Sequence, residues 1–192
     1  MASLAPVLRV GDLPLAELCA ARLDGELVGV DECFSPIDVH TGPFQRATAL
    51  AGAWAPRLIA EQRTAAWVWG ATPDSPARHQ LCASIGARAR AHIPQRSVVR
   101  EVVIDDDEIV ALGSVRVTAP LRTVTDLARF SAEFAEAEAG IVRQLLAGAG
   151  LDLDDCARAL DRRRNLPAKK LAWARLRWAC SSSYPEFTLY TS

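Results

Sequence analysis

The pattern of hydrophobic and polar positions in residues 1–70 alternates between helical and strand-like spacing. It predicts a helix at 15–23, a hairpin formed by 26–30 and 33–37, a helix at 43–54, a short strand or connection at 57–60, and a helix at 61–70. Pro43 near a first turn and Gly70 at a C-cap position support the last two helices. A helix, a tight turn and a hairpin form the end of a winged helix-turn-helix, but a complete one needs about three helices before the wing. The pattern of residues 1–42 therefore predicts a truncated winged-helix-like segment.

The next part of the chain contains short apolar or alternating runs, followed by helical spacing. Strands are predicted at 79–85, 97–104, 107–113 and 114–118, which together form a small, mainly antiparallel sheet with helices. Helices are predicted at about 119–130, 132–148 and 152–161, with a further helix after Pro167. The expected fold class is α+β, divided into the truncated segment 1–42, an α+β core at 43–130, a C-terminal helical bundle at 131–180 and an irregular tail at 181–192.

Residues 114–130, SVRVTAPLRTVTDLARF, bring hydroxyls, cations and a carboxylate to one strand-to-helix corner. Thr118 can accept N–H groups of the first helical turn, and Pro120 suits a helix start because it has no N–H to leave unpaired. Arg122 and Asp126 lie one turn apart, in a pair worth about 0.3–0.5 kcal/mol on a surface. The sequence predicts a structural joint at Thr118 and Pro120, with Arg122 and Asp126 available to a partner.

Catalysis at this corner would need a nucleophile with a base, or converging carboxylates. No histidine lies near it in the sequence. The acidic run at 104–108 would suit a metal-dependent nuclease only with an E-x-K on the next strand, which reads SVRVT. The five scattered cysteines contain no CxxC, and no Gly-rich phosphate loop is present. We therefore expect no enzyme activity, metal or cofactor; an activity that depends on Asp105 or Asp107 would contradict this expectation.

The net charge of −1 conceals a strong asymmetry, because residues 158–178 hold eight cations against Asp161 alone, a local charge of +7. Such a region is either a solvated face or a contact for nucleic acid or an acidic protein surface. The residues that we expect to contact a partner, together with the pair at the corner, are Arg122, Asp126, Arg162, Arg163, Arg164, Lys169, Lys170, Trp173 and Arg177.

The last predicted helix has two adjacent faces of different character. Lys170, Trp173 and Arg177 share one face through their i, i+3, i+7 spacing. The adjacent face is formed by Leu171, Ala174 and Trp178. We expect the second face to anchor the helix and the first to meet a partner.

Several segments together resemble the AbiEi-type antitoxin family, which is common in actinobacteria. The matching pieces are the wing-like ELVGVDECFSP, then TAAWVWG, and above all VRVTAPLRTVTDLAR, in this order over about residues 20–178. Family members typically add an N-terminal winged-helix domain that binds the promoter of their own operon, and most of that domain is missing here. In some relatives a nuclease-like domain begins with a Ser-rich segment similar to residues 180–192.

The resemblance implies a protein that is encoded beside a nucleotidyltransferase-fold toxin and neutralises it. We therefore expect a non-enzymatic antitoxin whose partner is this toxin. The alternative is a DNA-binding transcriptional regulator of its own operon, with promoter DNA as the partner. No stretch of eighteen consecutive apolar residues and no signal-peptide pattern is present, so we expect a cytoplasmic protein without a membrane contact.

Overall fold

The computed structural model describes residues 5–86 and 95–181, so most of the predicted tail at 181–192 lies outside the described residues. In chain order its elements are α1 (Leu15–Leu23), β1 (Leu27–Val30), β2 (Cys33–Pro36), α2 (Pro43–Ala49), β3 (Ile59–Ala60), α3 (Gln62–Val68), β4 (His79–Ser84), β5 (Ser97–Val102), the short 3-10 helix η1 (Asp106–Glu108), β6 (Ile109–Leu112), β7 (Val115–Thr118), α4 (Pro120–Phe130), α5 (Glu136–Ala149), α6 (Leu153–Asp161) and α7 (Lys169–Ser181). The α+β class with C-terminal helices is confirmed. Within the described chain, no helix is long and apolar enough to cross a bilayer.

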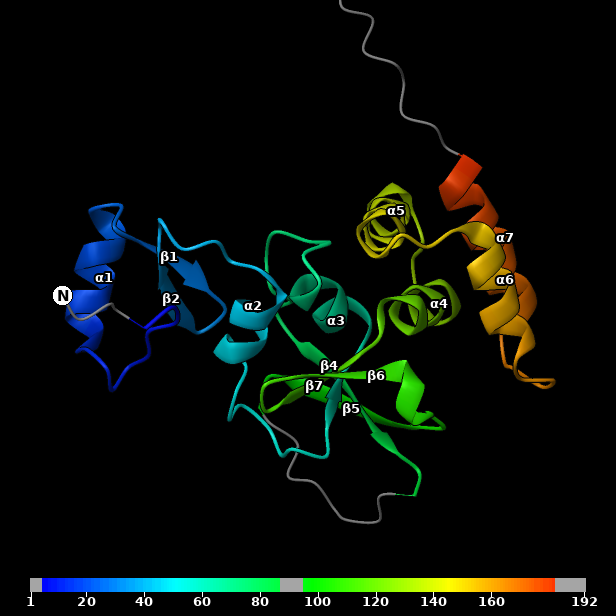
Figure 1. Cartoon of the computed structure of the whole chain (residues 1–192), viewed down its shortest axis with the longest axis horizontal. Helices are drawn as coiled ribbons and strands as arrows, with labels where there is room; N and C mark the ends of the chain where they lie inside the picture. Colours follow the sequence, from blue (N-terminus) through cyan, green and yellow to red (C-terminus); the bar gives the residue numbers. More distant parts are fainter. Residues whose placement is uncertain (1–4, 87–94, 182–192) are drawn as a thin grey trace, which may run out of the picture.

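The N-terminal elements α1, β1 and β2 lie at one end of the molecule, opposite α6 and α7 (Figure 1). The predicted hairpin is present, with β1 and β2 antiparallel. Leu8 extends it by exchanging two backbone hydrogen bonds with Phe34, at 2.7 and 2.9 Å. Leu8 and Phe34 form a small hydrophobic cluster with Leu18 and Leu27. This end of the chain therefore has a core of its own.

The central sheet has five strands in the order β5-β4-β3-β7-β6. The β3–β4 and β6–β7 pairings are antiparallel, whereas β3–β7 and β4–β5 are parallel. The prediction of a mainly antiparallel sheet was therefore wrong, and the sheet is mixed. The connection between β4 and β5 spans residues 85–96, and about a dozen residues are enough for a crossover between parallel strands.

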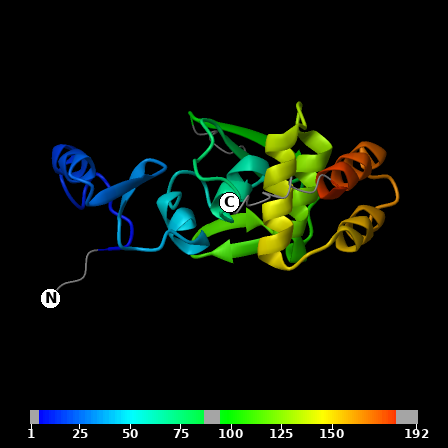
Figure 2. The same ribbon diagram turned by 90° about the horizontal axis from the view of Figure 1, so that it is seen from above.

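Helices cover the sheet and continue into a helical layer, in which α4 is the central element (Figures 1 and 2). Ala60, Leu81 and Val117 of the sheet pack with α2 and α3 in one hydrophobic cluster, in which Trp67 is 2% exposed. A second cluster joins α4 to α5, α6 and α7. Since α4 contacts α3, α5, α6 and α7, almost its whole circumference is buried.

The strand-to-helix corner differs from the prediction in how its first turn is made. Pro120 is the first residue of α4, as predicted, but the N-cap residue is Ala119, without a side-chain cap hydrogen bond. Thr118 is the last residue of β7, and its Oγ1 lies 2.7 Å from Thr123 Oγ1. Trp69 Nε1 donates to the Thr118 carbonyl at 2.9 Å. The predicted capping role of Thr118 was wrong, because its hydroxyl is fully buried and bonds across the first turn to Thr123.

The buried face of α7 also differs from the prediction. Ala172, Leu176 and Ala179 are fully buried, whereas Leu171, Ala174 and Trp178, the expected anchor, are exposed. Small side chains at a helix contact allow close approach of the backbones, and interaxial distance depends on the side chains at the contact. Ala172 and Ala179 therefore face the neighbouring helices together with Leu176, while Leu171, Ala174 and Trp178 lie on the outer side of α7.

Candidate functional site

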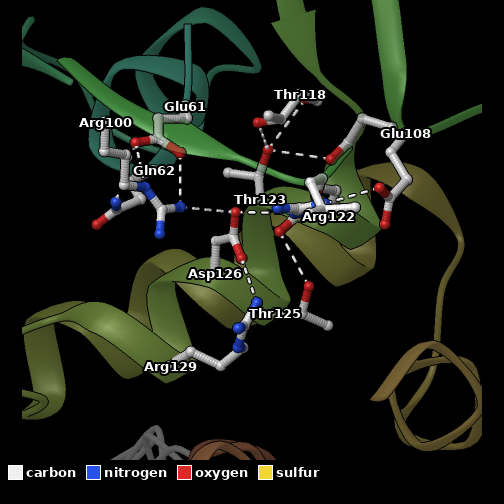
Figure 3. Close-up of polar contacts among 12 residues, drawn as sticks. Glu61, Gln62, Arg100, Glu108, Thr118, Arg122, Thr123, Thr125, Asp126 and Arg129 are labelled. Carbon is white, nitrogen blue, oxygen red and sulfur yellow. Dashed lines mark hydrogen bonds and ion pairs between the residues drawn. The ribbon is translucent and has the colours of Figure 1, made fainter. Parts of the chain in front are cut away.

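Asp126 on α4 is fully buried and accepts hydrogen bonds from three arginines (Figure 3). Its Oδ2 accepts from Arg100 Nη2 at 2.9 Å and from Arg122 Nε at 2.8 Å, and its Oδ1 accepts from Arg129 Nη1 at 3.0 Å. The Arg122–Asp126 pair predicted on a surface is therefore buried, with exposed fractions of 7% and 0%. The i, i+4 spacing correctly makes these residues neighbours, but spacing alone does not show which side of a helix faces the protein.

Two further carboxylates bind the same arginines. Glu61, the N-cap residue of α3, accepts from Arg100 Nε and Nη2, both at 2.6 Å, in the bidentate geometry that suits guanidinium and carboxylate groups. Glu108 of η1 accepts from Arg122 Nη1 at 2.7 Å and from Arg163 Nη2 at 2.8 Å. We refer to these residues as the arginine–carboxylate network: Glu61, Arg100, Glu108, Arg122, Asp126, Arg129 and Arg163. The network ties α3, β5, η1, α4 and the α6–α7 connection together.

The guanidinium groups of the network are not equally compensated. Burial alone would lower the pKa of each, because desolvation disfavours the charged form. For Arg100 and Arg122, contacts with carboxylates outweigh burial and raise the pKa. For Arg129, burial and the neighbouring cations outweigh the contact with Asp126, and the pKa is lowered. Arg129 is therefore the network arginine whose positive charge relies most on Asp126 for compensation.

The acidic run at 104–108 faces arginines. Arg163 Nη2 donates to Asp105 Oδ2 at 2.9 Å, and this hydrogen bond lowers the pKa of the Asp105 carboxyl. Arg162 Nη1 donates to Asp107 Oδ2 at 2.8 Å. Glu108 belongs to the network, so these carboxylates are held in ion pairs with arginines. Within residues 5–86 and 95–181, no group of three or more His, Cys, Asp or Glu side chains is placed to hold a metal ion.

Most cations of the C-terminal region are also satisfied within the chain. The ion pairs are Arg158–Asp155, Arg162–Asp107, Arg163 with Asp105 and Glu108, and Lys169–Asp161. Arg175 Nη1 donates to the carbonyls of Ala128 and Ser131, at 3.1 and 3.0 Å. Arg164, Lys170 and Arg177 are exposed and have no hydrogen bond or ion pair with the described residues. The local charge of +7 therefore overstates the charge that a partner would meet.

The predicted site residues fall into two groups. Arg122, Asp126 and Arg163 lie in the network, and Arg162 lies beside it. Arg164, Lys170 and Arg177 lie outside it, as does the half-buried Trp173, which lines a cleft of about 420 Å³ with Leu160, Lys169 and Lys170.

Sequence reasoning missed Glu61, Arg100 and Arg129 as members of the network. Arg129 lies three residues after Asp126, so the helical spacing that links Arg122 to Asp126 also indicates this contact. Arg100 is a cation inside a predicted strand, and Glu61 begins a predicted helix. Neither position indicates a partner so distant in the sequence.

Comparisons with known proteins add little to this description. No family model matches the chain, and no curated protein matches it. Among solved structures, the crystal structure of the RV2827C protein from Mycobacterium tuberculosis is similar, with a TM-score of 0.43 and 14% identity, over 91% of this chain and 71% of that chain. A similarity at this level assigns neither a fold nor a function.

Proposed function

We propose that this chain is a cytoplasmic, non-enzymatic antitoxin that binds and neutralises a nucleotidyltransferase-type toxin. The observation that carries the proposal is the exposed surface of α7, where cations without partners among the described residues alternate with exposed apolar side chains. We call this the α7 surface; it comprises Lys170, Leu171, Trp173, Arg177 and Trp178 of α7, together with Arg164 of the preceding connection. Leu171 is 48% exposed and Trp178 is 42% exposed. Arginine and aromatic side chains beside apolar area are typical of protein interfaces, so an acidic protein surface fits best.

The stretch that resembles AbiEi-type antitoxins packs against the inner side of α7, opposite the α7 surface. It includes α4, whose Arg129 Nε donates to the Pro167 carbonyl at 3.0 Å, just before α7. Arg175 of α7 in turn donates to the Ala128 carbonyl of α4. A binding surface held on rigid elements loses less conformational entropy when a partner binds. The shared stretch thus has a structural role that is compatible with an antitoxin.

The experiment is coexpression with a neighbouring gene for a nucleotidyltransferase-type toxin, scored by growth rescue and by the affinity of the purified pair. Lys170→Glu with Arg177→Glu reverses two charges on the α7 surface and should weaken binding by about tenfold or more, because like charges would then face each other. The matched control is Arg22→Glu with Arg78→Glu, which makes the same charge change at exposed positions outside this surface. Unchanged protection by the α7 variant would remove the α7 surface from the mechanism.

A DNA-binding regulator is the second candidate, favoured by the order of α1 and the β1–β2 hairpin. The electrostatics of this segment oppose it, since residues 1–42 contain two arginines and seven carboxylates, a net charge of −5. Specific binding to promoter DNA should weaken with salt by about one logarithmic unit of slope per phosphate contact. A gel-shift assay at low salt without a complex would exclude this candidate.

A further inference from the structure

A cleft of about 540 Å³ lies beside the arginine–carboxylate network, between the end of β5, the end of α4 and the α6–α7 connection. The network arginines that line it are Arg100, Arg122, Arg129 and Arg163. Its apolar lining comes from Val102, Val103, Phe130, Leu166 and Pro167. Small-molecule sites commonly measure about 300–1,000 Å³ and combine an apolar lining with a few placed polar groups. The cleft therefore has the size and the mixed lining of a ligand site.

Each of the four guanidinium groups has one nitrogen that has no acceptor in the described chain. These nitrogens are Arg100 Nη1, Arg122 Nη2, Arg129 Nη2 and Arg163 Nε. None of the four is among the buried polar atoms that lack a partner in the described chain, so each reaches solvent. Carboxylates accept from the other nitrogens of the same groups, except for Arg129 Nε and Arg163 Nη1, which donate to the carbonyls of Pro167 and Val103. The donors are thus positioned before a ligand arrives, which lowers the entropic cost of binding.

The charge of the lining is positive. Four arginines line the cleft together with one carboxylate, Glu101, whereas the carboxylates of the network do not line it. A carboxylate ligand offers two oxygens, but a phosphate monoester carries a charge of about −1.5 to −2 and three acceptor oxygens. Arginine also binds phosphate in bidentate geometry. A phosphate group therefore uses several arginine donors better than a carboxylate does.

The apolar side of the cleft indicates that the phosphate belongs to an organic molecule. Phe130 is 39% exposed and Val103 is 59% exposed. The guanidinium carbons of Arg100 and Arg129 lie 4.1 and 4.4 Å from the centre of the Phe130 ring, which holds the ring in place. Inorganic phosphate would leave these side chains uncovered.

An extended polyanion fits less well, because acidic groups lie next to the arginines. Asp107 and Glu108 line a neighbouring cleft of about 150 Å³, which shares Arg122, Arg129 and Arg163 with the larger one. We propose that the larger cleft binds a phosphorylated small molecule of nucleotide size, with the phosphate on the arginines and the organic part against Phe130. This site is separate from the α7 surface and does not depend on the proposed toxin contact.

The test is isothermal titration calorimetry of the full chain with adenosine 5′-monophosphate, compared with inorganic phosphate and with a single-stranded oligonucleotide. Arg163→Gln should weaken binding of the monophosphate by about 10- to 100-fold, because a charge-assisted hydrogen bond is lost. Arg163 is the arginine least needed for folding, since Glu108 keeps its contact with Arg122. The matched control is Arg164→Gln, an exposed neighbour that does not line the cleft and should bind with unchanged affinity.

Thermal unfolding of each variant separates loss of binding from loss of the fold. If Arg163→Gln does not fold, Arg163→Lys replaces it, which keeps the charge but removes the planar fork and should still weaken binding. The proposal is overturned if adenosine 5′-monophosphate gives no binding heat at millimolar concentration or if a folded Arg163 variant binds it as well as the wild type. It is also overturned if inorganic phosphate binds as tightly, or if the oligonucleotide binds more tightly.

Discussion

Asp126→Asn is the substitution that most directly tests whether the arginine–carboxylate network stabilises the fold. Asparagine has nearly the same shape as aspartate, so the packing of α4 is kept. One acceptor oxygen becomes an NH₂ donor and the negative charge is lost. The residue that accepts from Arg100, Arg122 and Arg129 can then no longer satisfy all three donors.

The expected loss follows from how each arginine is compensated. Arg100 retains Glu61 and Arg122 retains Glu108, whereas Arg129 is 8% exposed and has no other carboxylate partner in the described chain. Removing one partner of a buried ion pair costs about 3–5 kcal/mol in the free energy of unfolding. This is a large part of a typical stability of about 5–15 kcal/mol. At about 2–4 °C per kcal/mol for a chain of this size, Tm should fall by about 6–20 °C.

Urea unfolding followed by tryptophan fluorescence provides the assay, because Trp67 is 2% exposed and reports on the core. The matched control is Asp107→Asn, which removes the same charge from an exposed ion pair with Arg162 and should leave the midpoint unchanged. If Asp126→Asn has the same urea midpoint and slope as Asp107→Asn, the network contributes nothing measurable to the free energy of unfolding. The inference that a buried ion pair stabilises this fold is then refuted.

The remaining predictions concern single positions outside the network. Burial would raise the pKa of Asp31, but hydrogen bonds from His79 and Ser75 outweigh burial and lower this pKa. The ionised Asp31 therefore stabilises the folded state at a pH above its unfolded pKa of about 3.9, and this stabilisation is lost as the pH falls through the pKa of the folded state. Asp31→Asn, which also tolerates the φ of 55° there, should therefore flatten the loss of stability below about pH 5 in denaturant titrations. Gly70→Ala should lower the free energy of unfolding by about 1–2 kcal/mol, because the φ of 87° strains an L-residue although no atom lies within 4 Å of its Cβ. Gly140→Ala, inside α5, should raise it by about 0.5–1 kcal/mol in the same assay.

The order of the elements was predictable because each one depends on local spacing. The helix at 61–70 is α3, and Gly70 has the left-handed conformation expected just after a helix. The hairpin and the helix after Pro120 were equally local. The pairing of the central sheet was not predictable, since β3 binds β7, which follows it by more than fifty residues. Hydrophobic spacing shows which residues of a strand share a face, but it does not determine the neighbouring strand or its direction.

The burial of charge in α4 was the least predictable feature of the candidate site. Arg122, Asp126 and Arg129 are residue types that are almost never fully buried unless they are paired. Their partners Glu61 and Arg100 come from α3 and β5, which precede α4 in the chain, and local patterns do not link such distant positions. Seen from the sequence, the polar residues of VRVTAPLRTVTDLAR resemble a solvated helix face. In the folded chain they bind one another and adjacent elements.

The contrast between Arg163 and Arg164 separates the two proposed activities. Arg163 donates to the Val103 carbonyl, Asp105 and Glu108 and lines the cleft, whereas Arg164 is exposed without a partner in the described chain. Substitution of Arg163 should weaken binding of adenosine 5′-monophosphate and leave toxin binding by the α7 surface unchanged. Lys170→Glu with Arg177→Glu should weaken toxin binding and leave binding of the monophosphate unchanged. If both changes weakened toxin binding equally, the toxin would be contacting the network as well as α7. The cleft and the α7 surface would then form one interface, and adenosine 5′-monophosphate should compete with the toxin.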